Sequence, residues 1–159
     1  MKSAKCFFTG HRILSNEDKE RLQKILIKYI EQLESEGIYE FYTGGALGFD
    51  YVAAMAVAEV KKNKPYICLK LCLPCYGSEK RWSSKEKFNF QMLKTKCDSF
   101  EYMSKEEYYD GCMQKRNEDM AKMCGTCIAF CKRDKSGTKK TIDFAESNGC
   151  RVINLAEEF

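Results

Sequence analysis

The chain has 159 residues, of which 44% are hydrophobic and 31% are charged, and its net charge is +4. This composition predicts one globular domain with a sizeable core. The sequence has no apolar run of about 18 residues and no apolar stretch of the kind found in signal peptides, which argues against a membrane span and against export. The charge is too small to argue for nucleic acid by itself, and it is compatible with a small anionic ligand.

Short apolar runs alternate with amphipathic segments along the whole chain. Predicted strands cover 5–9, 40–43, 66–73, 99–103, 126–131 and 151–155. Predicted helices cover 17–36, 46–62, 112–124 and 138–147. A further helix is predicted to follow the polar stretch 77–88 and to end near Lys94, and residues 105–110 are predicted to form a short helical turn. This alternation predicts the α/β class: a three-layer, Rossmann-like open sheet of about six mostly parallel strands with helices on both faces. We expect residues 1–159 to form this one domain.

The predicted helices differ in where their apolar residues lie. In 17–36 they recur at spacings of three and four, which indicates one buried face. Segment 46–62 is apolar on nearly every side, so we expect it to be central and buried. In 112–124, Arg116 and Asn117 share a helical face with three methionines, so two polar groups lie on the stripe that should face the protein.

The ten cysteines raise the question of a metal site. Residues 68–75 contain C-x3-C-x2-C, which resembles the cluster motif of radical enzymes that use S-adenosylmethionine, and 124–131 contain C-x2-C-x3-C, which could offer metal ligands. Both groups lie in or beside predicted strands, where Cys68 and Cys72 would be about 13 Å apart and unable to share one metal. We therefore predict no metal site, and interpret the cysteines as reduced, small hydrophobic residues of a cytoplasmic protein.

Glycines, hydroxyls and basic residues gather where the predicted strands end. Ligands bind at the carboxyl ends of strands in open parallel sheets. The turns TGHR, TGGALG and KRDKSGT follow three of the strands, and two of these turns place glycine just before a helix, whose N-terminal N–H groups attract anions. Thr43 stands where a dinucleotide fingerprint needs its first glycine, so that motif is absent, as is a Walker A motif. The candidate ligand-binding residues of these turns are Gly10, His11, Arg12, Gly44, Gly45, Ala46, Gly48, Gly137 and Thr138.

Two charged residues in predicted helices allow both a structural and a functional interpretation. Asp50 lies in the first turns of an apolar helix, where it either balances the helix dipole or accepts hydrogen bonds from sugar hydroxyls. A buried guanidinium needs partners, so Arg116 either forms an internal ion pair with an acid such as Asp50 or Glu118, or lines a ligand pocket together with Asn117. We favour the pocket for Arg116 and leave both interpretations of Asp50 open.

Three further side chains are singled out by their type. His11 is the only histidine, and it is either a turn residue or a hydrogen-bonding or acid–base group. Arg12 beside it could hold a phosphate with two hydrogen bonds. Trp82 is the only tryptophan, and it could stack on a base, close a lid or simply pack.

Several of these stretches resemble a known family. CFFTGHR, YTGGALGFD, LKLCLPC, GCMQKRNEDM, SGTKKTIDFA and the single tryptophan are similar, in the same order, to motifs of the YpsA-like family of the SLOG superfamily. Rossmann-like relatives include the DNA-processing protein DprA and the cytokinin-activating LOG enzymes. The resemblance spans Cys6 to about Leu155, and it implies a Rossmann-like sheet with a pocket for a nucleotide-derived ligand. By position, that pocket would include Gly10, His11, Arg12, Gly44, Gly45, Gly48, Asp50, Arg116, Asn117, Gly137 and Thr138.

The chain departs from the LOG pattern at a catalytic position. LOG enzymes carry P-G-G-x-G-T-x-x-E, whose glutamate serves in N-glycosidic hydrolysis. Thr141 occupies the glutamate position here, and Ser136 replaces the commoner glycine before Gly-Thr. The resemblance therefore does not extend to the hydrolysis that LOG enzymes perform.

Three functions follow as hypotheses. The first is cytoplasmic binding or sensing of a nucleotide or a nucleotide-derived small molecule, such as an ADP-ribose-like ligand. The second is a hydrolase or transferase acting on such a ligand, with His11 and Asp50 as acid–base candidates but no visible catalytic dyad. The third, single-stranded nucleic-acid binding as in DprA, is disfavoured by the modest charge and the lack of interleaved aromatic and basic residues. Relatives often self-associate, so the resemblance also suggests a homodimer, and no membrane partner is expected.

Overall fold

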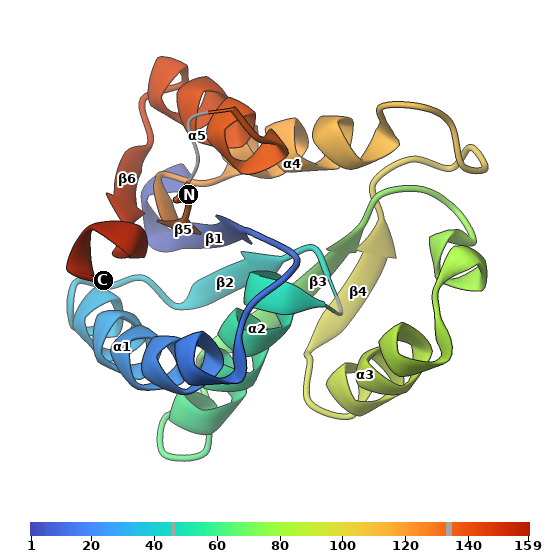
Figure 1. The fold of residues 1–159 in the computed structure, drawn as a ribbon. Helices are drawn as coiled ribbons and strands as arrows, with labels where there is room; N and C mark the ends of the chain where they lie inside the picture. The colour runs from blue at the N-terminus through green and yellow to red at the C-terminus, as the bar shows by residue number, and fades with distance from the viewer. Residues whose placement is uncertain (46, 133–134) are drawn as a thin grey trace.

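The centre of the fold is a six-stranded sheet in which every strand pair is parallel (Figure 1). A computed structural model describes residues 1–45, 47–132 and 135–159. The strand order is β4-β3-β2-β1-β5-β6, so the order reverses where β1 pairs with both β2 and β5. The strands are β1 (Lys5–Gly10), β2 (Glu40–Thr43), β3 (Cys68–Leu73), β4 (Ser99–Tyr102), β5 (Thr126–Phe130) and β6 (Arg151–Asn154).

Helices cover both faces of this sheet, which confirms the predicted three-layer α/β architecture (Figure 1). One face carries α1 (Asn16–Ser35), α2 (Gly48–Lys61) and α3 (Ser84–Lys94), and the other carries α4 (Cys112–Met123) and α5 (Gly137–Ser147). Short 3-10 helices span Lys2–Ala4, Ser78–Arg81 and Leu155–Glu158. Among the described residues, no helix is long and apolar enough to cross a membrane.

The helical turn predicted at 105–110 is wrong, because this segment is irregular. The Tyr76 backbone N–H donates to the Glu106 carbonyl oxygen over 2.9 Å, and the Glu106 N–H donates to the Ser104 hydroxyl over 3.2 Å. The segment is thus held by the turn that follows β3 and by a neighbouring side chain. The first of these bonds joins residues 30 positions apart, and the local sequence contains no signal for it.

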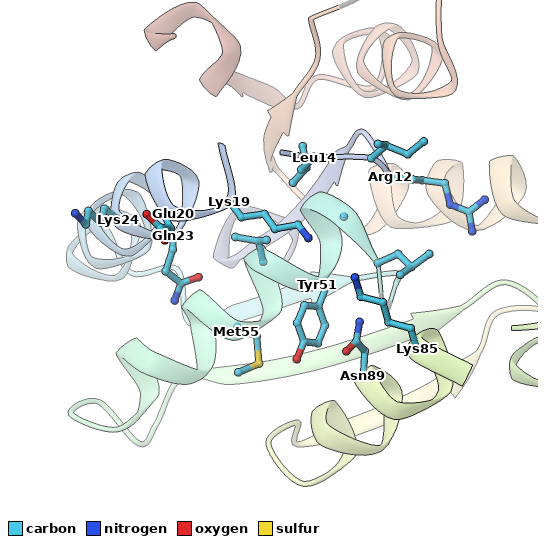
Figure 2. Close-up of a pocket in the computed structure, with 14 residues that line it drawn as sticks. Arg12, Leu14, Lys19, Glu20, Gln23, Lys24, Tyr51, Met55, Lys85 and Asn89 are labelled. Carbon is cyan, nitrogen blue, oxygen red and sulfur yellow. The ribbon is translucent and has the colours of Figure 1, made fainter. Parts of the chain in front are cut away.

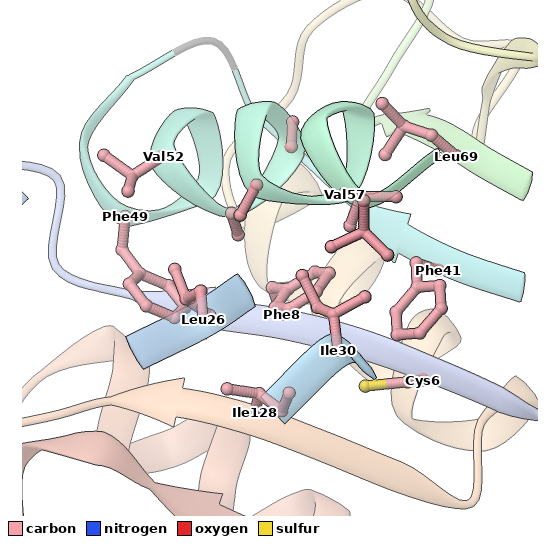
Figure 3. Close-up of a cluster of buried hydrophobic side chains, with 14 of the residues drawn as sticks. Cys6, Phe8, Leu26, Ile30, Phe41, Phe49, Val52, Val57, Leu69 and Ile128 are labelled. Carbon is pink, nitrogen blue, oxygen red and sulfur yellow. The ribbon is translucent and has the colours of Figure 1, made fainter. Parts of the chain in front are cut away.

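The alternation of side chains along β1 divides the core into two layers. Cys6 and Phe8 face the layer under α1 and α2, whereas Phe7 faces the layer under α4 and α5. Figure 3 shows the first layer, where Phe8 lies among side chains such as Ile30 and Val57. Both faces of the central strands are covered, which is why these strands are apolar at almost every position.

The cysteines belong mainly to these core layers. All ten are free thiols, and burial raises the pKa of Cys72 to about 12 and that of Cys75 to about 11. Within 1–45, 47–132 and 135–159, no three side chains of His, Cys, Asp or Glu come together as a metal-binding group. Most cysteines therefore behave as small apolar residues.

Two glycines allow the turn after β1 to pack against the start of α2. A Cβ atom at Gly10 would overlap the Phe49 ring, and one at Gly48 would overlap the Arg12 backbone. Gly48 also has a φ of 59°, which favours glycine. The Phe49 N–H donates to the His11 carbonyl oxygen over 3.0 Å. The TGHR and GGALGFD stretches are therefore in direct contact, and together they form one side of the sheet's carboxyl edge.

We expect Gly10→Ala to lower the free energy of unfolding by about 1–3 kcal/mol, because the added methyl group would displace the buried Phe49 ring. Gly137→Ala is the matched control, because no atom lies within 4 Å of a Cβ built there. That control should change stability by less than about 0.5 kcal/mol. Urea unfolding of both variants measures the difference, and equal effects would contradict the close contact at Gly10.

Candidate functional site

A cavity of about 490 Å³ opens at the carboxyl edge of the sheet, close to the point where the strand order reverses. We call it the edge cavity. It is formed by the turns after β1, β2 and β3 and by the first turns of α4 and α5. Its lining residues are Thr9, Gly10, His11, Arg12, Ile13, Gly44, Gly45, Leu47, Asp50, Pro74, Trp82, Glu86, Met113, Gln114, Arg116, Asn117, Ser136, Gly137 and Thr138.

Most of the residues predicted from the strand ends meet in this cavity. The structure brings together Gly10, His11, Arg12, Gly44, Gly45, Asp50, Arg116, Asn117, Gly137 and Thr138. Gly48 does not line it, because it packs beneath the Arg12 backbone and faces a neighbouring cavity. Ala46 lies outside the described residues. The predicted residues that line the edge cavity come from four separate segments of the chain, 10–12, 44–50, 116–117 and 137–138.

Arg116 joins the ends of two strands from inside the wall of the cavity. Its Nη1 donates to the Gly44 carbonyl oxygen and, over 3.3 Å, to the Cys72 carbonyl oxygen, and its Nε donates to Asn117 Oδ1 over 2.9 Å. A Cβ atom at Gly44 would overlap the guanidinium group, so glycine is needed there for close approach. Burial lowers the pKa of Arg116 from its usual value, while the nearby Asp50 carboxylate acts in the opposite direction.

Of the two interpretations of Arg116, the internal ion pair is replaced by backbone contacts, and the residue lines the edge cavity as favoured from the sequence. Arg116 forms no ion pair with the carboxylates in the part of the chain that the structure describes. Instead the guanidinium fixes the β2–α2 turn relative to β3. Its positive charge remains at the cavity wall, where it can attract an anionic ligand.

Asp50 presents a buried oxygen without a hydrogen-bond partner. The residue is partly exposed as a whole, but its Oδ1 is buried and unpaired, and the carboxyl lies against Gly45. The main-chain carbonyl of Asp50 accepts a hydrogen bond from the Thr43 hydroxyl over 3.0 Å, which holds this first turn of α2 in place. Burial raises the pKa of the carboxyl to about 6, although Arg116 and Arg12 act to lower it. A buried acceptor without a donor lowers stability, and such groups are rare in folded proteins.

His11 is held by the backbone of the turn that follows β5. Its Nε2 accepts a hydrogen bond from the Lys132 backbone N–H over 2.8 Å, and its ring lies edge-on to Phe130. Because Nε2 acts as the acceptor, the neutral ring carries its proton on Nδ1. His11 thus links the turn after β1 to the turn after β5, and its Nε2 is already engaged.

The start of α5 provides an open turn at the cavity. The Ser136 hydroxyl caps this helix by accepting from the Lys139 N–H over 3.1 Å. Gly137 and Thr138 follow it, and the space beside Gly137 is empty. Thr141, one turn later, is fully buried and donates to the Gly137 carbonyl oxygen over 3.1 Å, so its hydroxyl is used within the helix.

Some lining residues were not identified from the sequence. Glu86 lies within the polar stretch 77–88, and it completes a capping box with Ser83. Gln114 lies on the same helix as Asn117, three residues earlier, and this spacing was the only signal for it. Trp82 lines the cavity and also packs edge-on against Phe90, with ring centroids 5.1 Å apart.

We expect Asp50→Asn to stabilise the protein in a pH-dependent manner. The pKa of Asp50 is about 6 in the folded chain against an ordinary value of 3.8, so the folded chain binds the proton more tightly than the unfolded chain. The free energy of unfolding therefore falls as the pH rises from about 4 to 6, and the whole loss is present above pH 6. The variant should raise the free energy of unfolding by about 1–3 kcal/mol at pH 8 and have little effect at pH 4. Urea unfolding at both pH values measures this, with the exposed Asp110→Asn as control. A pH-independent gain would contradict the burial of the charge.

Solved structures with a similar fold are DNA-processing proteins. DprA from Streptococcus pneumoniae superposes with a TM-score of 0.65 at 17% identity, over 95% of this chain and 50% of that one. DprA from Helicobacter pylori, described for its single-stranded DNA binding mode, superposes with a TM-score of 0.65 at 16% identity, over 95% of this chain and 64% of that one. The chain thus spans from half to somewhat under two thirds of these proteins. At such identities the likeness concerns the fold.

Similarity in sequence extends to bacterial proteins and to a family profile. An uncharacterized SPbeta prophage-derived protein, YoqJ of Bacillus subtilis (strain 168), is 30% identical over 160 residues, which cover 92% of this chain and 94% of YoqJ. A UPF0398 protein of Oenococcus oeni is 30% identical over 79 residues, which cover 50% of this chain and 42% of that protein. The YpsA profile, described as the YspA SLOG family, matches residues 7–148. The chain therefore belongs to the YspA SLOG family.

Proposed function

We propose that the protein binds a nucleotide or a nucleotide-derived small molecule in the edge cavity. The observation that carries the proposal is the convergence, in one cavity, of two helix starts, two arginines and the unpaired Oδ1 atom of Asp50. The cavity volume of about 490 Å³ falls within the range of small-molecule sites. In this proposal residues 1–159 are one SLOG-type domain that acts in the cytoplasm.

The phosphate end of the ligand would lie against α5 and the turn after β1. N–H groups in the first turn of a helix lack partners within the helix and favour anions. Gly137 and Thr138 occupy this turn, and the empty space beside Gly137 admits a phosphate group. Arg12 is exposed at the same cavity and can supply two parallel hydrogen bonds.

The sugar end of the ligand would lie against α2. Asp50 Oδ1 is an acceptor without a donor, and ribose hydroxyls are donors of the required kind. Leu47, at the N-terminus of α2, provides no side-chain cap for this helix. The Phe49 N–H in the first turn of the helix donates to the His11 carbonyl oxygen. The turn is thus fixed by protein contacts on one side while its carboxylate is left for a ligand.

Binding is favoured over catalysis by the state of the acid–base candidates. His11 Nε2 accepts a backbone hydrogen bond, and Thr141, at the position of the LOG glutamate, is buried and internally bonded. Asp50 has a raised pKa of about 6 but no paired second acid or base in contact with it. These groups support a site that recognises a ligand, and a hydrolase or transferase remains the second hypothesis to be tested.

We expect Arg12→Gln to weaken binding of ADP by about tenfold, because it removes one charge-assisted contact to phosphate. Arg21→Gln is the matched control, since Arg21 packs over the Phe159 ring outside the edge cavity. Isothermal titration calorimetry of the full chain with AMP, ADP and ADP-ribose gives the affinities. Equal losses in the two variants, or no binding of any of these ligands to the parent chain, would overturn the proposal.

Two further measurements separate the alternatives. Mass spectrometry of each ligand after incubation detects hydrolysis or transfer, and unchanged ligands would count against the enzyme hypothesis for that set. A gel shift with single-stranded DNA at increasing salt tests nucleic-acid binding as described for the Helicobacter pylori protein. DNA binding that ADP does not compete with would place the nucleic acid outside the edge cavity.

A further inference from the structure

A second, larger cavity lies next to the edge cavity. It has a volume of about 640 Å³ and runs over the outer surface of α2, between α1 and α3 (Figure 2). We call it the helix groove. The two cavities share Arg12, Ile13 and Leu47, which belong to the turns after β1 and β2. A ligand that occupies the edge cavity therefore has direct access to the helix groove.

The floor of the helix groove is apolar and carries one aromatic ring. Val52 is buried, and Tyr51 and Met55 are half-buried on the outer side of α2. Figure 2 shows Tyr51 and Met55 below the start of α2 and facing the space between the helices. A flat aromatic group can stack on such a floor, because every nucleobase has a π-face and stacking tolerates any base.

The rim of the helix groove is basic. Lys19 from α1 and Lys85 from α3 extend towards this space from opposite sides (Figure 2), and Lys24 and Arg12 complete the positive charge. Glu20 is the only acid among the lining residues that the structure describes. None of these four cations forms an ion pair with residues in the described ranges. Cations that form no ion pair within the protein are complementary to a ligand with several negative charges.

We infer that the helix groove receives the second nucleoside of a dinucleotide polyphosphate. Resting on the function proposed above, this places the first nucleotide in the edge cavity and the bridging phosphates at the shared wall. Arg12, Lys19 and Lys85 would hold the phosphates, and the second base would stack on Tyr51 and pack against Met55. The apolar floor matches the aromatic base, and the cationic rim beside it matches the phosphate chain.

The test compares two ligands that differ only by the second nucleoside. Calorimetry of the full chain with adenosine 5′-tetraphosphate and with diadenosine 5′,5′-tetraphosphate isolates its contribution. We expect the dinucleotide to bind at least about tenfold more tightly, as one stacked base contributes. Tyr51→Ala should abolish this advantage, and Tyr51→Phe, which retains the ring, should keep it.

A charge-reversal pair tests the rim. Lys85→Glu should reduce the affinity for the dinucleotide by about tenfold, whereas Lys87→Glu, on the same helix but outside both cavities, should not. Thermal unfolding of each variant shows that the fold is intact.

Each result decides between the two sites. Tight binding of adenosine tetraphosphate without an advantage for the dinucleotide would overturn the role of the helix groove and leave the edge cavity standing. An advantage that survives in Tyr51→Ala, or an affinity for the dinucleotide that Lys85→Glu leaves unchanged, would also overturn it. Absence of binding for both ligands would overturn this inference, and it would overturn the proposed function as well only where AMP, ADP and ADP-ribose also fail to bind.

Discussion

The contact between the turn after β1 and the first turn of α2 is the constraint on which both cavities depend. Gly10 admits the Phe49 ring, and Gly48 admits the Arg12 backbone. These two close approaches bring Arg12, Ile13 and Leu47 together, and those residues form the wall between the edge cavity and the helix groove. Side chains at either glycine would separate the two turns. The architecture of the candidate site thus follows from backbone packing before any ligand contact is considered.

The polar groups of the edge cavity divide into those that support the fold and those left for a ligand. Arg116 uses hydrogen bonds to the Gly44 and Cys72 carbonyl groups to hold two strand ends together, and His11 does the same between the turns after β1 and β5. Asp50 keeps an unpaired, buried oxygen, which is unfavourable for stability. Proteins commonly retain such groups at functional sites, where stability is exchanged for binding.

The features that can be predicted from the sequence are those whose physical cause is local in the chain. Strands and long helices were predicted well because burial on one or both sides leaves a regular apolar pattern, as in β1 and α1. The segment 105–110 was predicted wrongly because a hydrogen bond from Tyr76, distant in sequence, decides its conformation. Gly48 is predicted at the ligand from its glycine-rich context, and the structure places it against the Arg12 backbone in the lining of the helix groove. Glu86 was missed because an acid in the first turn of a helix is already explained by helix capping, which gives no sign of a cavity.

The amino-acid sequence by itself determined the α/β class, the strand-end turns and the family resemblance, since these depend on periodicity, glycine placement and short motifs. The strand order, and hence which turns become neighbours, was decided only by the tertiary structure. The same holds for the partners of Arg116, which are carbonyl groups in two different strand-end segments rather than a carboxylate. The helix groove also depends on the placement of α1 and α3 beside α2. The physical reason is that such contacts join residues far apart in the chain, for which one sequence carries no local pattern.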